Sequence, residues 1–257
     1  MKTPSIIIVL ATGTAASAAV IGLDARSAAG ENFDFATASV YSQMRSVLEA
    51  QGHTIVSIDS WNAGTLAGVD AVLMREANRP LGAYTAAEAA AIDAFNAAGG
   101  GVAFFADGGW ESNSLAGSNN LIANVLGAEL GPSANNPNGL LVTGFFPSPI
   151  FDGIDSWGTD FVRQISLGGA IPGVDLTIDG GDSDLAISRD GVGGRGNSAV
   201  FGDASWMLTS GAGDFDLGSL QNEQIFENLI NYLLVPAPGV TGMLCAAGLF
   251  STRRRRS

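Results

Sequence analysis

The sequence has little of what most metal centres and hydrolytic triads require. Among its 257 residues there is one cysteine and one histidine. A single cysteine, Cys245, excludes a disulfide framework and any Cys-rich zinc or iron–sulfur site. With His53 as the only imidazole, a His-based metal site or a Ser-His-Asp triad is hard to build. We therefore expect no bound metal and no cofactor.

Positive charge is also scarce, and it is concentrated at the two ends of the chain. Lys2 is the only lysine, and four arginines stand together at the C-terminus, Arg253 to Arg256. The whole chain has a formal charge of −13, but without its first 18 residues and this cluster, seven arginines face 25 acidic residues, which leaves −18. Binding to nucleic acid or to anionic lipid needs clustered Lys and Arg, so we expect neither for the body of the protein.

Hydrophobic residues are plentiful, at 46% of the chain, so wholesale disorder is excluded and one large domain can bury a core. Short apolar runs alternate with segments of helical periodicity. Strands are expected at 19–23, 54–58, 69–74, 102–106 and 198–201, and helices at 39–51, 85–98, 119–126 and 222–234. Thr85 and Glu88 form a capping box, and Gly52 is placed to end the first helix.

The alternation of strands and helices predicts parallel strands joined by right-handed crossovers. The strands are apolar throughout, as expected when helices cover both faces. The predicted fold is a three-layer α/β/α, flavodoxin-like domain with a mostly parallel sheet. Between residues 129 and 195, Gly, Pro, Asn and Asp dominate and short β-like runs appear, which predicts a β-rich excursion within the same domain.

The N-terminal residues 1–18 have the pattern of a secretory signal peptide. Lys2 is followed by an apolar run at 6–11 and then by Ala16-Ser17-Ala18, an A-x-A cleavage site. The alternative is a first buried strand at 5–11, but the strand candidate at 19–23 makes such a strand dispensable. We expect cleavage by signal peptidase and export.

The C-terminal residues 235–257 combine Pro236 and Pro238 with a short apolar run and the cluster of Arg253, Arg254, Arg255 and Arg256. The run is shorter than the ~20 residues that cross a bilayer comfortably, and arginines after it would stay cytoplasmic. A solvated tail with a chance arginine run is the alternative. The segment resembles the PEP-CTERM sorting signal of Gram-negative bacteria, although Ala237 stands where that family most often has Glu. The resemblance implies transient anchoring in the inner membrane, cleavage by an exosortase-type membrane protease, and delivery to the cell surface or extracellular polymer.

Several segments of residues 19–234 follow one another in a characteristic order: a helix ending at 48–53, a strand, 71–73, a capped helix from Tyr84 to Gly101, then 200–203 and 228–233. In this order the chain resembles the class I glutamine amidotransferase-like superfamily, in its uncharacterised DUF4350-like branch. Active members place a cysteine on the turn after a central strand, with a distant His and Glu. Asp107 stands at that position here, so the resemblance does not imply amidotransferase activity.

The ends of the predicted strands carry the residues that could form a ligand site. In an open parallel sheet, ligands bind beyond the carboxyl ends of the strands. Trp110 and Trp206 could stack on a sugar, Gly108 and Gly109 allow close backbone approach, and Arg75 is expected to pair with Glu76 or to clamp a carboxylate. Asp and Gly also favour strand-to-helix turns regardless of function. The full candidate rim is Asp24, Asp59, Arg75, Glu76, Asp107, Gly108, Gly109, Trp110, Asp203 and Trp206.

A separate acidic loop contains Asp179, Asp182, Asp184 and Asp190. Its oxygens could hold Ca²⁺, but the spacing matches no EF-hand, and a solvated loop is the simpler interpretation.

Two functions follow as hypotheses. In the first, the protein is an exported, surface-sorted, non-catalytic α/β module that binds a glycan or a protein partner. In the second, it is an exported hydrolase that uses rim carboxylates such as Asp107 and Asp203, since paired carboxylates can hydrolyse glycosidic bonds.

Overall fold

The structure is a computed structural model of the whole chain. It describes residues 18–26, 34–77, 83–107, 115–133, 140–160, 162–167, 174–175, 186–209 and 215–235. Several predicted features lie outside these residues: most of the predicted signal peptide, the predicted sorting tail from Pro236 to Arg256, Gly108, Gly109, Trp110 and residues 179–185 of the acidic loop.

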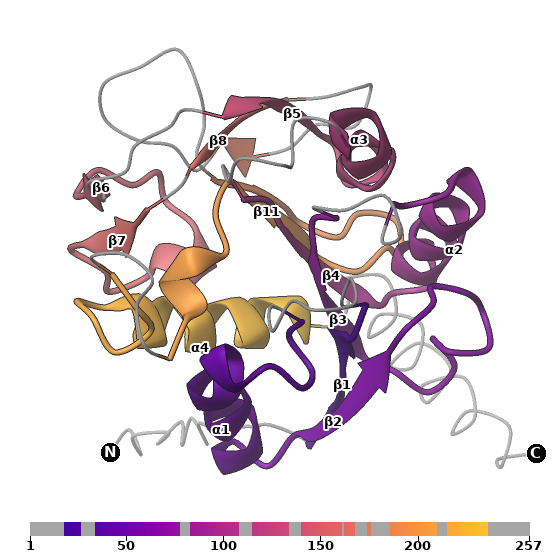
Figure 1. Cartoon of the computed structure of the whole chain (residues 1–257), viewed down its shortest axis with the longest axis horizontal. Coiled ribbons are helices and arrows are strands. Elements are labelled where there is room, and N and C mark those ends of the chain that lie inside the picture. Colours follow the sequence, from indigo (N-terminus) through magenta and orange to yellow (C-terminus); the bar gives the residue numbers. More distant parts are fainter. Residues whose placement is uncertain are drawn as a thin grey trace, which may run out of the picture.

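A seven-stranded sheet organises the fold, in the order β2-β1-β3-β4-β11-β10-β9 (Figure 1). Five of its strands are parallel: β1 (Val20–Asp24), β2 (Thr54–Ile58), β3 (Ala71–Arg75), β4 (Gly101–Phe105) and β11 (Ser198–Phe201). β10 (Ala186–Arg189) runs antiparallel to both β11 and β9 (Val174–Asp175). The predicted mostly parallel α/β fold is confirmed.

Helices cover the two faces of the sheet and form two cores. Alternate side chains of a strand point to opposite faces, so Leu73 packs with α1 (Ser42–Ala50) and α4 (Asn222–Leu233), and Met74 packs with α2 (Ala86–Ala97) and α3 (Ala116–Val125). The first core also takes in the short 3₁₀ helices η1 (Ser39–Tyr41), η4 (Pro149–Phe151) and η5 (Ser205–Met207). This is the three-layer arrangement expected from the sequence.

The β-rich excursion forms two small antiparallel sheets and also extends the main sheet. β5 (Ala128–Ser133) pairs with β8 (Arg163–Leu167), and β6 (Leu140–Val142) pairs with β7 (Trp157–Thr159) (Figure 1). Strands β5 and β7 were not expected from the sequence. The excursion is therefore less separate than predicted, because β9 and β10 complete one edge of the central sheet.

Local signals act as the sequence predicts. Thr85 Oγ1 accepts the Glu88 amide and Glu88 accepts the Thr85 amide, so the capping box opens α2. Gly52, with φ +83°, follows α1 in the left-handed conformation that favours glycine.

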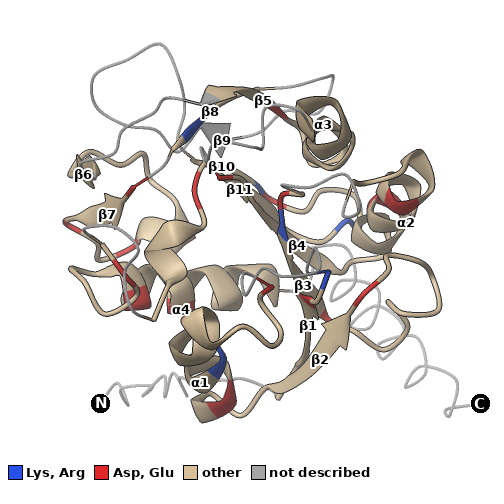
Figure 2. Ribbon diagram, in the orientation of Figure 1, with Lys and Arg blue, Asp and Glu red and all other residues tan. Residues whose placement is uncertain are grey.

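Among the described residues, no helix is both long and apolar enough to cross a membrane. Acidic positions outnumber basic ones along the described ribbon, and the basic positions are scattered rather than gathered on one side (Figure 2).

Candidate functional site

The carboxyl ends of β1, β3, β4 and β11 bring five of the predicted rim residues together. Asp24 and Arg75 end β1 and β3, Glu76 and Asp107 follow β3 and β4, and Asp203 follows β11. We refer to these five residues as the rim cluster. Asp59 is not part of it, because it lies exposed beyond the edge strand β2, where Ser60 donates a hydrogen bond to it.

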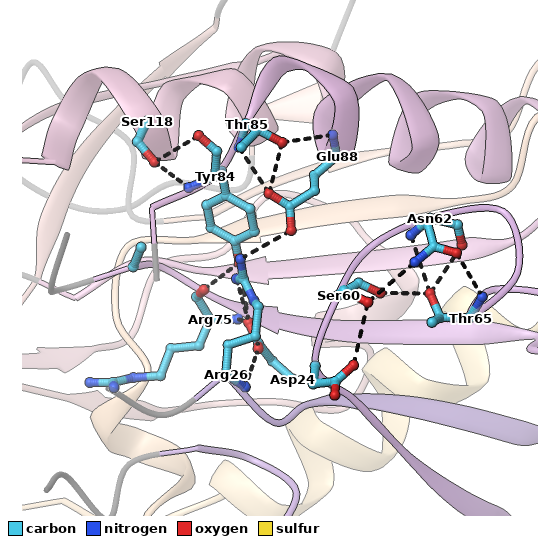
Figure 3. Close-up of polar contacts among 12 residues, drawn as sticks. Asp24, Arg26, Ser60, Asn62, Thr65, Arg75, Tyr84, Thr85, Glu88 and Ser118 are labelled. Carbon is cyan, nitrogen blue, oxygen red and sulfur yellow. Dashed lines mark hydrogen bonds and ion pairs between the residues drawn. The ribbon is translucent and has the colours of Figure 1, made fainter. Parts of the chain in front are cut away.

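Three side chains hold the backbone that leaves β3. The Asp24 carboxylate accepts the Arg75 amide at 3.3 Å, and the Tyr84 hydroxyl donates to the Arg75 carbonyl at 2.5 Å (Figure 3). Asn119 of α3 then bonds both backbone groups of Ala77, at 2.8 and 2.9 Å. Because the main chain is fixed on both sides of Glu76, the directions of the Arg75 and Glu76 side chains are also fixed.

The gap between β1 and β3 is the topological switch point of the sheet, where open α/β folds usually bind ligands. Here Arg26 fills it. Its guanidinium makes hydrogen bonds of 2.9 and 3.1 Å with Asp24 and lies 3.9 Å from the centre of the Tyr84 ring (Figure 3). Tyr84 Oη, which donates to the Arg75 carbonyl, also lies 3.2 Å from Asp24 Oδ2. Asp24 is therefore part of a bonded structural group that the protein supplies itself.

Arg75 pairs with Asp107 rather than with Glu76, which corrects the expected Arg75–Glu76 ion pair. Arg75 Nη2 lies 2.7 Å from Asp107 Oδ2. Successive residues of an extended strand point to opposite faces. Arg75 accordingly lies on the α1/α4 side with Asp107, and Glu76 points to the other side.

Glu76 meets Arg163 of β8, whose Nε lies 3.3 Å from Glu76 Oε2. Both side chains are fully buried. Neither Glu76 oxygen receives a hydrogen bond of normal geometry from the described residues. Burial raises the pKa of Glu76 to about 8, against the lowering effect of Arg163.

Asp203 is fully buried and accepts three hydrogen bonds. Their donors are the Thr159 hydroxyl at 2.5 Å and the backbone amides of Asp160 and Ser205 at 2.9 and 2.7 Å. Burial, and next the charge of Asp107, raise the pKa of Asp203 although these bonds oppose the change. Its bonding partners come from β7 and η5, so Asp203 ties the excursion to the sheet.

Trp206 is not available to stack on a sugar in this structure. Its side chain is fully buried in the α1/α4 core, and its indole nitrogen donates to the Asp203 carbonyl at 3.0 Å. His53 is also buried, and its Nδ1 accepts a hydrogen bond from the Ala19 amide.

The sequence analysis missed several residues that shape the site: Tyr41, Arg26, Tyr84, Thr159 and Asp160. Tyr41 is buried near Arg75, Asp107 and Asp203, and burial raises the pKa of its hydroxyl. Only Arg26 carried a signal in the sequence, since it follows the strand-ending Asp24 by two residues. Residues of the excursion become neighbours of the rim only through the tertiary fold.

The rim cluster and its neighbours can hold protons and orient one another, and each cationic group among them lies 2.7–3.3 Å from a carboxyl oxygen of the protein. Within the described part of the chain, no group of three or more His, Cys, Asp or Glu side chains could hold a metal ion.

Fold and site together define a flavodoxin-like α/β protein whose carboxyl rim is held by buried ion pairs. No protein-family model and no curated protein matches the sequence. Among solved structures, the mmIFT52 N-terminal domain is 17% identical with a TM-score of 0.63, covering 84% of this chain and 97% of that one.

Two further solved structures come from Salmonella typhimurium. Cytoplasmic Protein STM3548 is 13% identical with a TM-score of 0.58, covering 84% of this chain and 98% of its own. Cytoplasmic Protein STM1381, from strain LT2, is 14% identical with a TM-score of 0.51, covering 84% and 95%. At such identities the likeness shows a shared fold and nothing about activity.

Proposed function

We propose that this protein is an exported, surface-sorted α/β module that binds a glycan or a protein partner without catalysing a reaction. The observation that carries the non-catalytic part is the mutual pairing of the rim cluster. Asp24 is bonded to Arg26, Arg75 to Asp107, Glu76 to Arg163, and Asp203 to three donors of the protein. A general base or nucleophile must be able to reach a substrate, and these groups are already engaged by the protein.

The proposed relationship to the glutamine amidotransferase-like superfamily has the same consequence. The position after β4 that corresponds to that family's nucleophile holds Asp107, whose carboxylate is 2.7 Å from Arg75. A carboxylate held by a guanidinium is a weak replacement for a thiolate, because the ion pair lowers its nucleophilicity. We therefore propose that this branch uses the fold for recognition.

The second candidate, an exported hydrolase, is favoured by one specific observation. Burial raises the pKa of Glu76 to about 8, and the charge of Asp107 adds to the effect. A carboxyl group whose pKa is raised, near a second carboxyl group, is the arrangement that general-acid hydrolysis uses. In this alternative Glu76 donates the proton, and Asp107 or Asp203 acts as base or nucleophile.

The variants Asp107→Asn and Glu76→Gln separate the two functions. Asp59→Asn is the matched control, since Asp59 is exposed just after the edge strand β2. The purified protein is screened for binding to immobilised glycans and for hydrolysis of a panel of glycosides and esters. The binding module predicts no hydrolysis and near-unchanged binding by both variants. Hydrolysis that both variants lose and the control keeps would overturn it in favour of the enzyme.

Export and sorting are supported by the two end segments and are tested separately. The protein is located in its native cell, and both mature ends are sequenced by mass spectrometry. We expect an N-terminus near Ala19 and loss of the segment after Pro238. Full-length protein that retains Arg256 in the cytoplasm would contradict the proposal.

A further inference from the structure

A second group of charged residues lies at the other end of the parallel strands from the rim cluster, beside the amino ends of β4 and β11. Arg189 ends β10, beside Ser198 at the start of β11. Arg195 lies in the glycine-rich loop between these strands, and Asn96 lies near the end of α2. Both arginines donate to the same oxygen, Asn96 Oδ1, at 3.0 Å from Arg189 Nη2 and 3.1 Å from Arg195 Nε. The two nitrogens are therefore within about 6 Å of each other, a distance at which like charges repel.

At this end of the strands, the two arginines are not matched by an equal number of carboxylates within ion-pair distance among the described residues. Arg189 is only 6% exposed, it has no carboxylate within ion-pair distance among the described residues, and its Nη1 has no hydrogen-bond partner there. The nearby carboxylates are engaged elsewhere: Asp93 pairs with Arg195 at 2.5 Å, and Asp190 accepts from the Tyr232 hydroxyl at 3.0 Å. A buried guanidinium whose described hydrogen bond goes to a neutral amide is costly unless an anion is supplied.

Burial and then the neighbouring Arg195 lower the pKa of Arg189, and the charge of Asp93 opposes this change without reversing it.

The surrounding backbone keeps the two arginines together. The Asn96 side-chain amide donates to the Gly100 and Gly196 carbonyls, and the Asn96 backbone carbonyl accepts a hydrogen bond from the Gly196 amide at 2.7 Å. A Cβ atom on Gly196 would collide with the Gly100 carbonyl, so the loop lies directly on the turn that ends α2. The arginines cannot separate without breaking these bonds, and the positive site is preorganised.

We propose that Arg189 and Arg195 form a binding site for an oxyanion, with a carboxylate of a small acidic ligand as the favoured occupant. Asp93 shows how such a group is held, since its carboxylate is bound to Arg195. The Arg195 and Asp93 side chains are 28% and 46% exposed. An exposed ion pair contributes only ~0–1 kcal/mol, so an external carboxylate displaces Asp93 at little cost. With Asp93 displaced, a carboxylate bound to Arg195 lies beside Arg189, because the shared Asn96 acceptor keeps the two arginine nitrogens within about 6 Å of each other.

This site is independent of the proposed function at the rim. It lies at the amino ends of the parallel strands and shares no residue with the rim cluster. Failure of either proposal leaves the other unaffected.

The full-length protein tests the site by titration calorimetry and thermal denaturation with sodium galacturonate, phosphate and sulfate. Sodium chloride at equal ionic strength is the reference. We expect saturable binding of galacturonate and a concentration-dependent rise in Tm. Binding of phosphate or sulfate with equal affinity identifies a general oxyanion site, and preference for galacturonate identifies a carboxylate site.

Three variants make the result specific. Asp93→Asn removes the internal competitor and should tighten binding several-fold, whereas Arg195→Gln should weaken it at least tenfold. Arg45→Gln on α1 makes the same change of charge away from the site and should leave binding unchanged. Arg189→Gln should abolish binding if the protein folds; if it does not fold, the other variants decide. Absence of saturable binding by both the unsubstituted protein and Asp93→Asn, or equal loss in Arg45→Gln, would overturn the proposal.

Discussion

Replacing the buried Glu76 by Gln gives the sharpest test of the rim, because the change removes a titrating group while nearly preserving its shape. Burial raises the pKa of Glu76 from 4.5 to about 8. Between these two values the folded protein holds a proton on Glu76 that the unfolded chain has lost. The Glu76 contribution to stability is therefore fully present below pH ~4.5 and is lost as the pH rises toward 8.

The size of the effect follows from the shift. One proton of difference changes the free energy of unfolding by ~1.4 kcal/mol per pH unit, and the full window corresponds to at most ~5 kcal/mol. At pH 5 to 6, where Glu76 is protonated, Glu76→Gln should be close to the unsubstituted protein in stability, because Arg163 faces a neutral group in both. As the pH rises to 9, the unsubstituted protein should lose stability relative to the variant.

Urea unfolding followed by circular dichroism at each pH unit from 5 to 9 measures this difference. Glu129→Gln on the exposed face of β5 makes the same chemical change at the surface and serves as the control. If the stability curves of Glu76→Gln and the unsubstituted protein run parallel across the range, Glu76 is ionised throughout and our account of the Glu76–Arg163 pair is wrong.

Three further predictions concern the hydrogen bonds and backbone contacts that hold the rim cluster and the Arg189–Arg195 site in place. In each case the free energy of unfolding is measured by chemical denaturation. Tyr84→Phe removes the bond to the Arg75 carbonyl and should cost ~1–3 kcal/mol, since a buried acceptor loses its donor. Asn119→Ala removes two buried backbone bonds and should cost ~3 kcal/mol; a change below ~1 kcal/mol would show that this anchor is unimportant. Gly196→Ala brings a Cβ against a backbone carbonyl and should cost ~2 kcal/mol, whereas Gly117→Ala, in open space on α3, should stabilise by ~0.5–1 kcal/mol.

The sequence predicted which residues reach the rim better than it predicted their partners. Parallel strands end at one edge of a sheet, so residues that follow apolar runs, such as Asp24, Asp107 and Asp203, had to meet there. The predicted Arg75–Glu76 ion pair was wrong because the side chains of adjacent residues in an extended strand point to opposite faces of the sheet. This rule could have been applied to the sequence alone. The partner of Glu76, by contrast, is Arg163 of the irregular excursion, and no local pattern places that strand beside β3.

The burial of Trp206 was missed for a similar reason. A tryptophan after a strand can stack on a ligand or fill a core, and the sequence around it is the same in both cases. The choice is made by the partners that surround the ring, here Phe105, Trp157 and Phe201, which lie within about 6 Å of it. Two of these partners belong to the sheet and one to the excursion, so the outcome depends on contacts distant in the sequence.

The carboxyl and amino ends of the parallel strands differ in how their charges are balanced. This difference predicts at which end a bound ligand adds most to the stability of the protein. At the carboxyl ends of the parallel strands, Arg26 and Arg75 each have a carboxylate partner within the protein, and Arg163 lies 3.3 Å from the Glu76 carboxyl group. A ligand there must compete with bonds that already exist. At the amino edge, Arg189 is buried with an amide as its described acceptor. An anion that reaches Arg189 removes an existing electrostatic penalty and breaks only the exposed Arg195–Asp93 pair. For this chain, then, the usual preference of open α/β sheets for ligands at the carboxyl edge is opposed by the distribution of its few positive charges.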